Sequence, residues 1–260
     1  MKQKIAWREA AWIFVISRLV MLLITYIAII RFPIDNCDHY LPQGFEVQIC
    51  GRDIIAYALS WWRWDVVHFV AIAHDGYAQT SNTAFFPFWP LLVHGVGWML
   101  GGSEIAYYGV SIVLSNLFFY LALVLFYCLI KLDFEGAVAR KALVYLAFFP
   151  YALFFFAGYS ESLFLLLCLL VFWFLRRGGT RNFWLAGLCA CLAVLTRATG
   201  VILIVPFIVL YVQQSGARTL LTLKNWREKV GVLLPVLLIP LGVLTYMAYL
   251  WATKGNPVAL

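Results

Sequence analysis

The chain has 260 residues, of which 64% are hydrophobic and only 12% are charged. A soluble domain has about 45–50% apolar and about 25% charged residues, so this composition excludes an ordinary soluble protein. The net charge of +7 does not indicate nucleic acid, because the basic residues stand in short clusters between apolar runs. We therefore predict a polytopic membrane protein that lies in the lipid bilayer and has no nucleic acid as a partner.

The apolar runs predict an all-α protein with about seven membrane-spanning helices. The longest runs exceed the roughly 18 residues that cross a bilayer as a helix, and the runs lack the alternation of outer-membrane barrels. The first run is too long for a signal-peptide core, and no small-x-small cleavage pattern follows it, so we expect an uncleaved first span. We expect a single module over residues 1–260, with spans at residues 10–30, 106–130, 142–157, 162–175, 183–195, 200–212 and 230–252.

The basic clusters predict which way the chain faces. They occupy residues 2–8, 131–141, 176–181 and 218–229, and the positive-inside rule assigns them to the cytoplasm. The apolar segment 85–100 contains two prolines, and if it crossed, the cluster at 131–141 would lie outside. We therefore expect this segment to lie at the interface or dip into the membrane, so that residues 31–105 form one large outer loop.

Asp65 is the leading candidate for chemistry in the outer loop. A helix over residues 54–73 is expected to place Asp65, His68 and Phe69 on one face, because they have i, i+3 and i+4 spacing. Aromatic neighbours such as Trp64 would partly desolvate the carboxylate and raise its pKa towards that of a useful base. We assign Asp65 as the base, with His68 and Trp64 in substrate binding. The alternative is a surface aspartate balanced by Arg63.

Two further charged residues stand at predicted outer turns. Glu161, at the mouth of a span, is either a favourable charge at a helix N-terminus or a second acidic group that faces the substrate. Arg197 interrupts apolar sequence and is costly there, so it either binds a lipid phosphate or pairs with Glu161. Arg18 lies in the cytoplasmic half of the first span, and we expect a structural role for it, with its guanidinium reaching the interface along its alkyl chain.

The sequence gives weaker evidence for a cofactor and for a disulfide. His74 and Asp75 precede Gly76 and indicate a helix stop; a metal site is the alternative, but no ligand spacing is diagnostic. We therefore expect no cofactor, although a divalent metal stays an alternative. Cys37 and Cys50 are the only cysteines of the outer loop, and an oxidising compartment would permit a disulfide between them.

Several motifs resemble those of PIG-V-type mannosyltransferases, the family of the second mannosyltransferase of GPI-anchor synthesis. WDVVHF at 64–69, GY at 76–77 and FFP at 85–87 are similar to the first luminal loop of that family. YSESLF at 159–164 and TRATG at 196–200 resemble its next two motifs, in the same order. The short loops resemble bacterial homologues more than eukaryotic ones.

The resemblance implies a GT-C glycosyltransferase with seven spans and juxtamembrane helices in the first loop. Its catalytic aspartate maps to Asp65 and its second acidic position to Glu161. The implied donor is polyprenyl- or dolichyl-phosphate mannose, and the implied acceptor is a glycan or glycolipid on the outer or luminal face of a bacterial plasma membrane or the endoplasmic reticulum. A GT-C enzyme that uses another lipid-linked sugar is the alternative, followed by a transporter. Relatives continue past the equivalent of residue 260, so we expect the C-terminal part to be missing.

Overall fold

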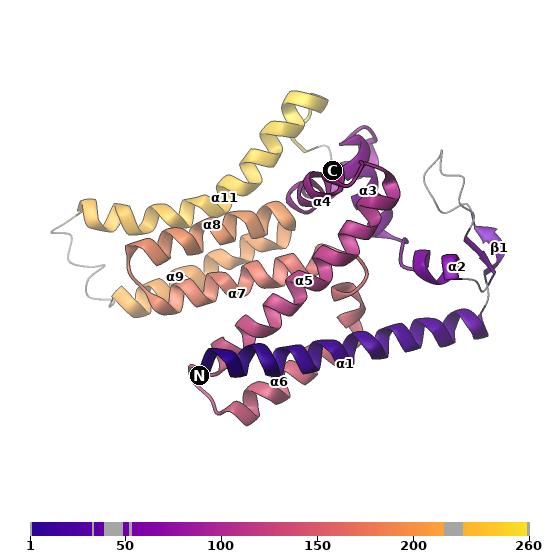
Figure 1. The fold of residues 1–260 in the computed structure, drawn as a ribbon. Helices are drawn as coiled ribbons and strands as arrows, with labels where there is room; N and C mark the ends of the chain where they lie inside the picture. Colours follow the sequence, from indigo (N-terminus) through magenta and orange to yellow (C-terminus); the bar gives the residue numbers. More distant parts are fainter. Residues whose placement is uncertain (1, 33, 39–48, 52–53, 216–225, 259–260) are drawn as a thin grey trace. The chain divides into compact units, whose positions relative to one another are not determined.

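The computed structural model describes residues 2–32, 34–38, 49–51, 54–215 and 226–258 of the chain (Figure 1). Most of these residues lie in helices, as the sequence predicts for an all-α membrane protein. The sequence did not predict the short antiparallel pair β1 (Ile34–Asp38) and β2 (Ile49–Gly51). The chain forms two compact units, one of residues 1–78 and 90–162, the other of residues 79–89 and 163–260.

Three long apolar helices satisfy the length and composition of a membrane span: residues Lys4–Arg31, Glu104–Ile130 and Leu234–Lys254. They confirm the predicted spans at residues 10–30, 106–130 and 230–252. The other four predicted spans also fall on helices, but these have only 12 to 17 residues. About 20 residues are needed to cross the hydrocarbon core as a straight helix. The crossing of these four helices therefore stays a prediction.

The first unit is built around α1 (Lys2–Arg31), α5 (Glu104–Ile130) and α6 (Gly136–Phe148), which contact one another. Ser103 sets the start of α5, because its hydroxyl accepts a hydrogen bond from the amide of Ala106 at 3.2 Å. Many large apolar side chains of α1 point away from the protein, as in a helix that faces lipid.

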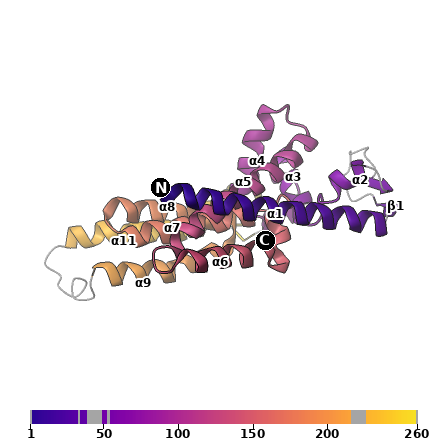
Figure 2. The ribbon, with the colours of Figure 1, turned by 60° about the horizontal axis from the view of Figure 1, so that its bottom comes forward.

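Shorter helices occupy the predicted outer loop. They are α2 (Ile54–Leu59), α3 (Asp65–Asp75), η1 (Thr80–Ala84) and α4 (Phe88–Met99). Within the first unit, α3 packs on the N-terminal part of α5 (Figure 2). At 1.5 Å per residue the 12 residues of α4 span about 18 Å, which is less than the roughly 30 Å hydrocarbon core. This length agrees with a segment that does not cross the membrane.

The prediction of one continuous helix over residues 54–73 is wrong. The helix stops after Leu59 and restarts at Asp65. The cause is tertiary: the Trp62 side chain is fully buried and its ring stacks on that of Tyr108 in α5, with centroids 4.9 Å apart. Burial of an indole contributes more to the stability of the fold than the few helical hydrogen bonds that the break removes.

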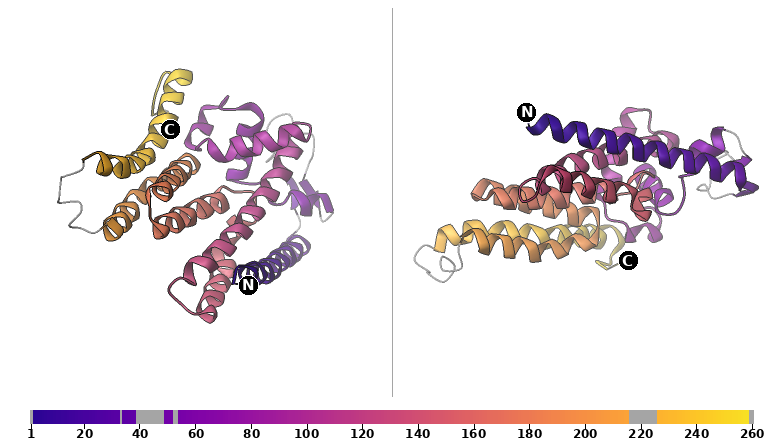
Figure 3. Two further views of the ribbon diagram at one scale, coloured as in Figure 1. Left: turned by 60° about the vertical axis from the view of Figure 1, so that its left-hand side comes forward. Right: turned by 90° about the horizontal axis from the view of Figure 1, so that it is seen from below.

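The second unit contains α7 (Glu161–Arg177) from residue 163 onward, α8 (Thr180–Thr196), η3 (Ala198–Leu203), α9 (Ile204–Ser215) and α11 (Trp226–Lys254). Its helices α8 and α11 lie side by side (Figure 3). A Cβ added to Gly187 would lie 2.4 Å from the carbonyl oxygen of Pro235, and one added to Gly242 would lie 2.9 Å from that of Cys191. Glycine at these positions allows the two backbones to approach closely, as is common between membrane helices.

Candidate active site

Asp65 is the first residue of α3, directly after a backbone turn of unusual geometry. Trp64 has φ 52° and ψ −129°, and it is the only non-glycine residue with positive φ in the described part of the chain. A side chain at positive φ costs about 1–3 kcal/mol, and such residues cluster at functional sites. The Trp64 side chain is 68% exposed, so burial of its indole does not explain the strain. The turn presents Asp65, which is half-buried, at the N-terminal end of a helix.

The residues just before Asp65 are fixed by packing within the first unit. The hydroxyl of Tyr108 donates to the carbonyl of Ala58 at 2.7 Å, on the helix that precedes the turn. The ring of Trp61 contacts that of Phe156 edge-on, with centroids 5.3 Å apart. This second contact links the Asp65 turn to the segment that leads to Glu161.

Tyr159 connects the two predicted carboxylates. Its side chain is 2% exposed and packs edge-on against Phe154. Burial raises the pKa of Tyr159, and the negative charges of Asp65 and Glu161 raise it further, while the Asp65 backbone acts in the opposite direction. The phenol of Tyr159 is therefore neutral, and the negative charges of both Asp65 and Glu161 act on it. Sequence reasoning assigned no role to Tyr159, although its place two residues before Glu161 in a recognised motif was a usable signal.

Glu161 begins α7, and its half-buried carboxylate lies in the first turn of that helix. The position is favourable for an acidic group at a helix N-terminus, and the charge of Glu161 acts on Tyr159; the interpretation that Glu161 faces the substrate stays a prediction. His68 lies one turn after Asp65 on α3 and is half-buried. The predicted i, i+3 relationship of these two residues is therefore present, although the helix is shorter than expected.

Arg197 belongs to the second unit, at the junction of α8 and η3. Its backbone is extended, its amide donates to the carbonyl of Ala193 at 2.9 Å, and its own carbonyl accepts from Gly200 at 2.9 Å. A Cβ at Gly200 would lie 2.7 Å from the backbone nitrogen of Val194, so only glycine allows this tight junction. The TRATG motif thus forms a compact corner that carries a half-buried arginine.

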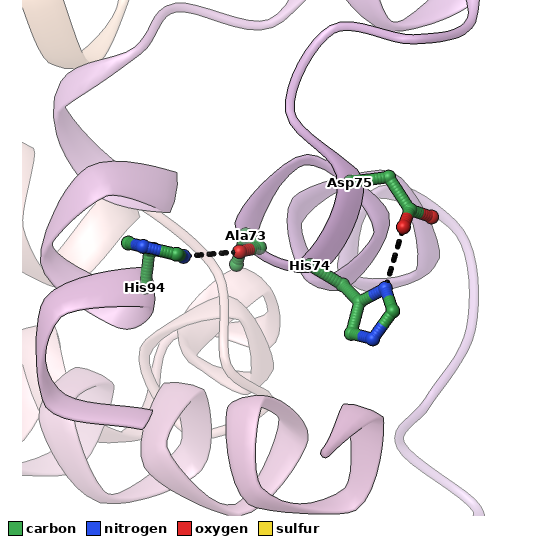
Figure 4. A network of polar contacts seen from close by, with 4 residues as sticks. All are labelled: Ala73, His74, Asp75 and His94. Atoms are coloured by element: carbon green, nitrogen blue, oxygen red, sulfur yellow. Dashed lines mark hydrogen bonds and ion pairs between the residues drawn. The ribbon is translucent and has the colours of Figure 1, made fainter. Parts of the chain in front are cut away.

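The contacts at the end of α3 agree with the helix stop that the sequence predicts at His74, Asp75 and Gly76 (Figure 4). Gly76 caps α3 with φ 67°, and its amide donates to the carbonyl of Ile72. His74 and Asp75 contact each other at 2.6 Å, and Nδ1 of His94 donates to the carbonyl of Ala73 at 2.6 Å, which joins α4 to α3. In the described part of the chain, no group of three or more His, Cys, Asp or Glu residues is placed to hold a metal ion.

The side chains of Cys37 and Cys50 lie outside the described residues. Their backbones are described: β1 pairs with β2 so that Asp38 is opposite Ile49. Cys37 precedes Asp38 in β1, and Cys50 follows Ile49 in β2. Because the strands are antiparallel, both cysteines lie on the same side of the Asp38–Ile49 pair. The disulfide therefore stays a prediction.

Comparison with known proteins gives a consistent result. The family described as mannosyltransferase (PIG-V) matches residues 8–255. The chain is 34% identical over 204 residues to GPI alpha-1,6-mannosyltransferase 2 of Mus musculus, which covers 72% of this chain and 40% of the mouse protein. It is 27% identical over 108 residues to GPI mannosyltransferase 2 of Schizosaccharomyces pombe, covering 41% of this chain and 23% of the yeast protein. The chain thus spans less than half the length of these relatives. No solved structure matches it.

Proposed function

Because the chain belongs to the mannosyltransferase (PIG-V) family, we propose that it takes part in the transfer of mannose from a polyprenyl- or dolichyl-phosphate donor to a hydroxyl group of a glycan or glycolipid. The observation that supports this proposal is the buried Tyr159, whose phenol is influenced by the negative charges of both Asp65 and Glu161. These residues come from two of the family-like motifs, almost one hundred positions apart, and Asp65 can supply the general base that the proposed transfer needs.

The proposed reaction is a single displacement with inversion. The acceptor oxygen forms a bond to the anomeric carbon, the bond from that carbon to the phosphate oxygen breaks, and the acceptor proton passes to the Asp65 carboxylate. The lipid phosphate leaves as a stable anion that keeps the bonding electrons, so the reaction requires no general acid for the leaving group.

Each remaining residue has a role that suits its surroundings. Glu161 and His68 orient the acceptor by accepting or donating hydrogen bonds. The hydroxyl of the neutral Tyr159 is buried without a hydrogen-bond partner in the described structure, so it is available to donate a hydrogen bond to a bound substrate. The exposed indole of Trp64 offers an apolar face to a sugar or lipid. Arg197 binds the donor phosphate, because a guanidinium suits the planar, bidentate recognition of phosphate.

The charge pattern supports an active site on the outer or luminal face of a bacterial plasma membrane or of the endoplasmic reticulum. The positive-inside rule assigns the basic clusters at residues 2–8, 131–141, 176–181 and 218–229 to the cytoplasm, which leaves the segments of Asp65 and Glu161 for the opposite side of the membrane. A cysteine introduced at Gly102, compared with one at Gly136, tests the orientation with a membrane-impermeant thiol reagent in intact cells. Labelling at Gly102 alone agrees with the proposal, and labelling at Gly136 alone would reverse the orientation.

The activity is tested with the purified full-length protein and a panel of lipid-phosphate sugars. We expect transfer from the mannosyl lipid, and transfer at least about 100-fold slower when Asn replaces Asp65. Transfer from a different lipid-linked sugar only would favour the alternative within the GT-C superfamily. Absence of transfer from every donor, with a folded protein, would reject a transferase and return attention to transport.

A further inference from the structure

Arg18 lies near the middle of α1, within a membrane-spanning segment, yet its side chain is only 7% exposed. The expectation that it reaches the interface is therefore wrong. Among the residues whose side chains are described, it makes no ion pair. A buried charge inside a membrane protein is costly, so a residue of this kind marks a functional or organising position.

The guanidinium is used to bind backbone rather than a carboxylate. Nη1 of Arg18 donates to Oδ1 of Asn116 at 3.3 Å and to the carbonyl of Phe155 at 3.1 Å. Nδ2 of the same Asn116 donates to the carbonyl of Phe156 at 3.0 Å. The hydroxyl of Ser162 donates to the Phe155 carbonyl at 3.3 Å. Side chains from three helices thus converge on two successive peptide groups.

Aromatic packing holds the same two residues. The Arg18 guanidinium carbon lies 4.6 Å from the ring centroid of Phe119 and 5.6 Å from that of Phe156. The Phe119 ring in turn stacks on the Phe155 ring at 4.7 Å. Cations over aromatic faces are attracted to them, and the attraction grows where water is excluded.

This segment needs such support because its backbone is irregular. It comprises the last residue of the short helix η2 (Pro150–Phe155) and the residue after it, and it precedes α7, so its carbonyls have no regular helical partners. Inside a membrane protein, polar groups of this kind must be satisfied by neighbouring side chains. A planar guanidinium and an amide satisfy them in fixed directions, whereas a lysine ammonium would act as a point donor.

We propose that Arg18 is a positioning residue: together with Asn116 it clamps the carbonyls of Phe155 and Phe156 and thereby holds Tyr159 and Glu161 beside Asp65. The clamp itself follows from the contacts above, and its consequence for catalysis rests on the proposed function. The Phe156 ring also touches Trp61, four residues before Asp65, so the clamped turn contacts both sides of the site.

The test combines hydrogen–deuterium exchange with kinetics on the full-length protein in lipid nanodiscs. Arg18→Met keeps an unbranched stem but removes every donor, so amides in residues 149–162 should exchange faster. Turnover should fall by about 100-fold, as a small misplacement of catalytic groups can produce, while the donor dissociation constant changes less than twofold. Arg18→Lys should restore part of both losses. Arg8→Met is the matched control, because Arg8 is an exposed residue of the same helix.

Wild-type exchange over residues 149–162 in both Arg18→Met and Asn116→Leu would overturn the clamp. Faster local exchange with unchanged turnover would overturn the positioning role. If Arg18→Met does not fold, Arg18→Lys and Asn116→Leu decide by the same two readouts. If the wild-type protein transfers no mannose from any donor, yet these variants loosen residues 149–162, the proposed function fails while the clamp stands.

Discussion

The hydroxyl of Tyr246, in the last span, lies 2.7 Å from the carbonyl oxygen of Thr83 in η1 and donates a hydrogen bond to it. The same hydroxyl lies 3.1 Å from the carbonyl of Phe85, and the Phe86 ring packs on the Tyr246 ring at 4.8 Å. Within the second unit, Tyr246 thus anchors the segment that begins the FFP motif.

This anchor predicts that Tyr246→Phe destabilises the second unit. The substitution leaves the Thr83 carbonyl without this donor, and a buried polar group left unsatisfied costs about 1–3 kcal/mol. Thermal unfolding in detergent should shift to lower temperature, and amides in residues 79–89 should exchange faster. Trp251→Phe, at an exposed site on the same helix, serves as the control. Equal exchange in the two variants would argue against the anchor.

Asp65→Asn should abolish most of the proposed transfer while the protein stays folded. The amide keeps the shape of the side chain but cannot accept the acceptor's proton, and general-base catalysis contributes about 10²–10⁴-fold. We expect turnover to fall by at least the lower figure, with donor affinity retained. Asp75→Asn is the matched control, at the exposed end of the same helix. Near-normal turnover of the Asp65 variant would move the search for the base to Glu161.

Arg197→Ala should affect donor binding rather than the proton transfer. Loss of the guanidinium removes the charge-assisted hydrogen bonds proposed for the phosphate, which are worth about 1.5–3 kcal/mol each, or roughly 10- to 150-fold in affinity. Titration of the purified protein with the lipid-phosphate donor measures this change. Arg181→Ala removes an exposed arginine at the opposite end of α8 and should bind the donor normally. Equal affinities for both variants would remove Arg197 from the phosphate site.

The Cys37–Cys50 pair is predicted to form a disulfide wherever the outer loop meets an oxidising compartment. The β1–β2 ladder supports this link, because the two cysteines adjoin the paired residues Asp38 and Ile49. Mass spectrometry of unreduced, alkylated protein should find one peptide that contains both cysteines. Recovery of both in alkylated form, from cells that export the loop, would exclude the bridge.

Hydrophobic runs predicted the helices well, because a span of about 20 apolar residues has few alternatives. The prediction for α5 agrees with the structure to within two residues at its start. The first helical interruption was missed, since it depends on the stacking of Trp62 on Tyr108, and those residues lie far apart in the sequence. Local periodicity carries no information about such a contact.

The candidate site, like the fold, was predicted from the sequence only in part. Asp65 and Glu161 were predicted from the residue types and their family-like motifs, and in the structure the charges of both raise the pKa of the buried Tyr159; their roles stay predictions. The position of Asp65 at the start of a helix was not predicted, because it follows from the positive φ of Trp64. The prediction that the Arg18 guanidinium reaches the interface was wrong, because it considered only the position of Arg18 along its own helix. Its partners Asn116 and Phe155 come from other segments of the chain.

The strained turn at Trp64 also has a consequence for biogenesis. A tryptophan does not adopt a backbone conformation with positive φ by itself. The turn therefore forms only after the Trp62 ring has packed against the ring of Tyr108. Tyr108 is synthesised later and lies at the start of the second long span. The turn that presents Asp65 can therefore take its final shape only after the helix that carries Tyr108 has been synthesised and has packed against it.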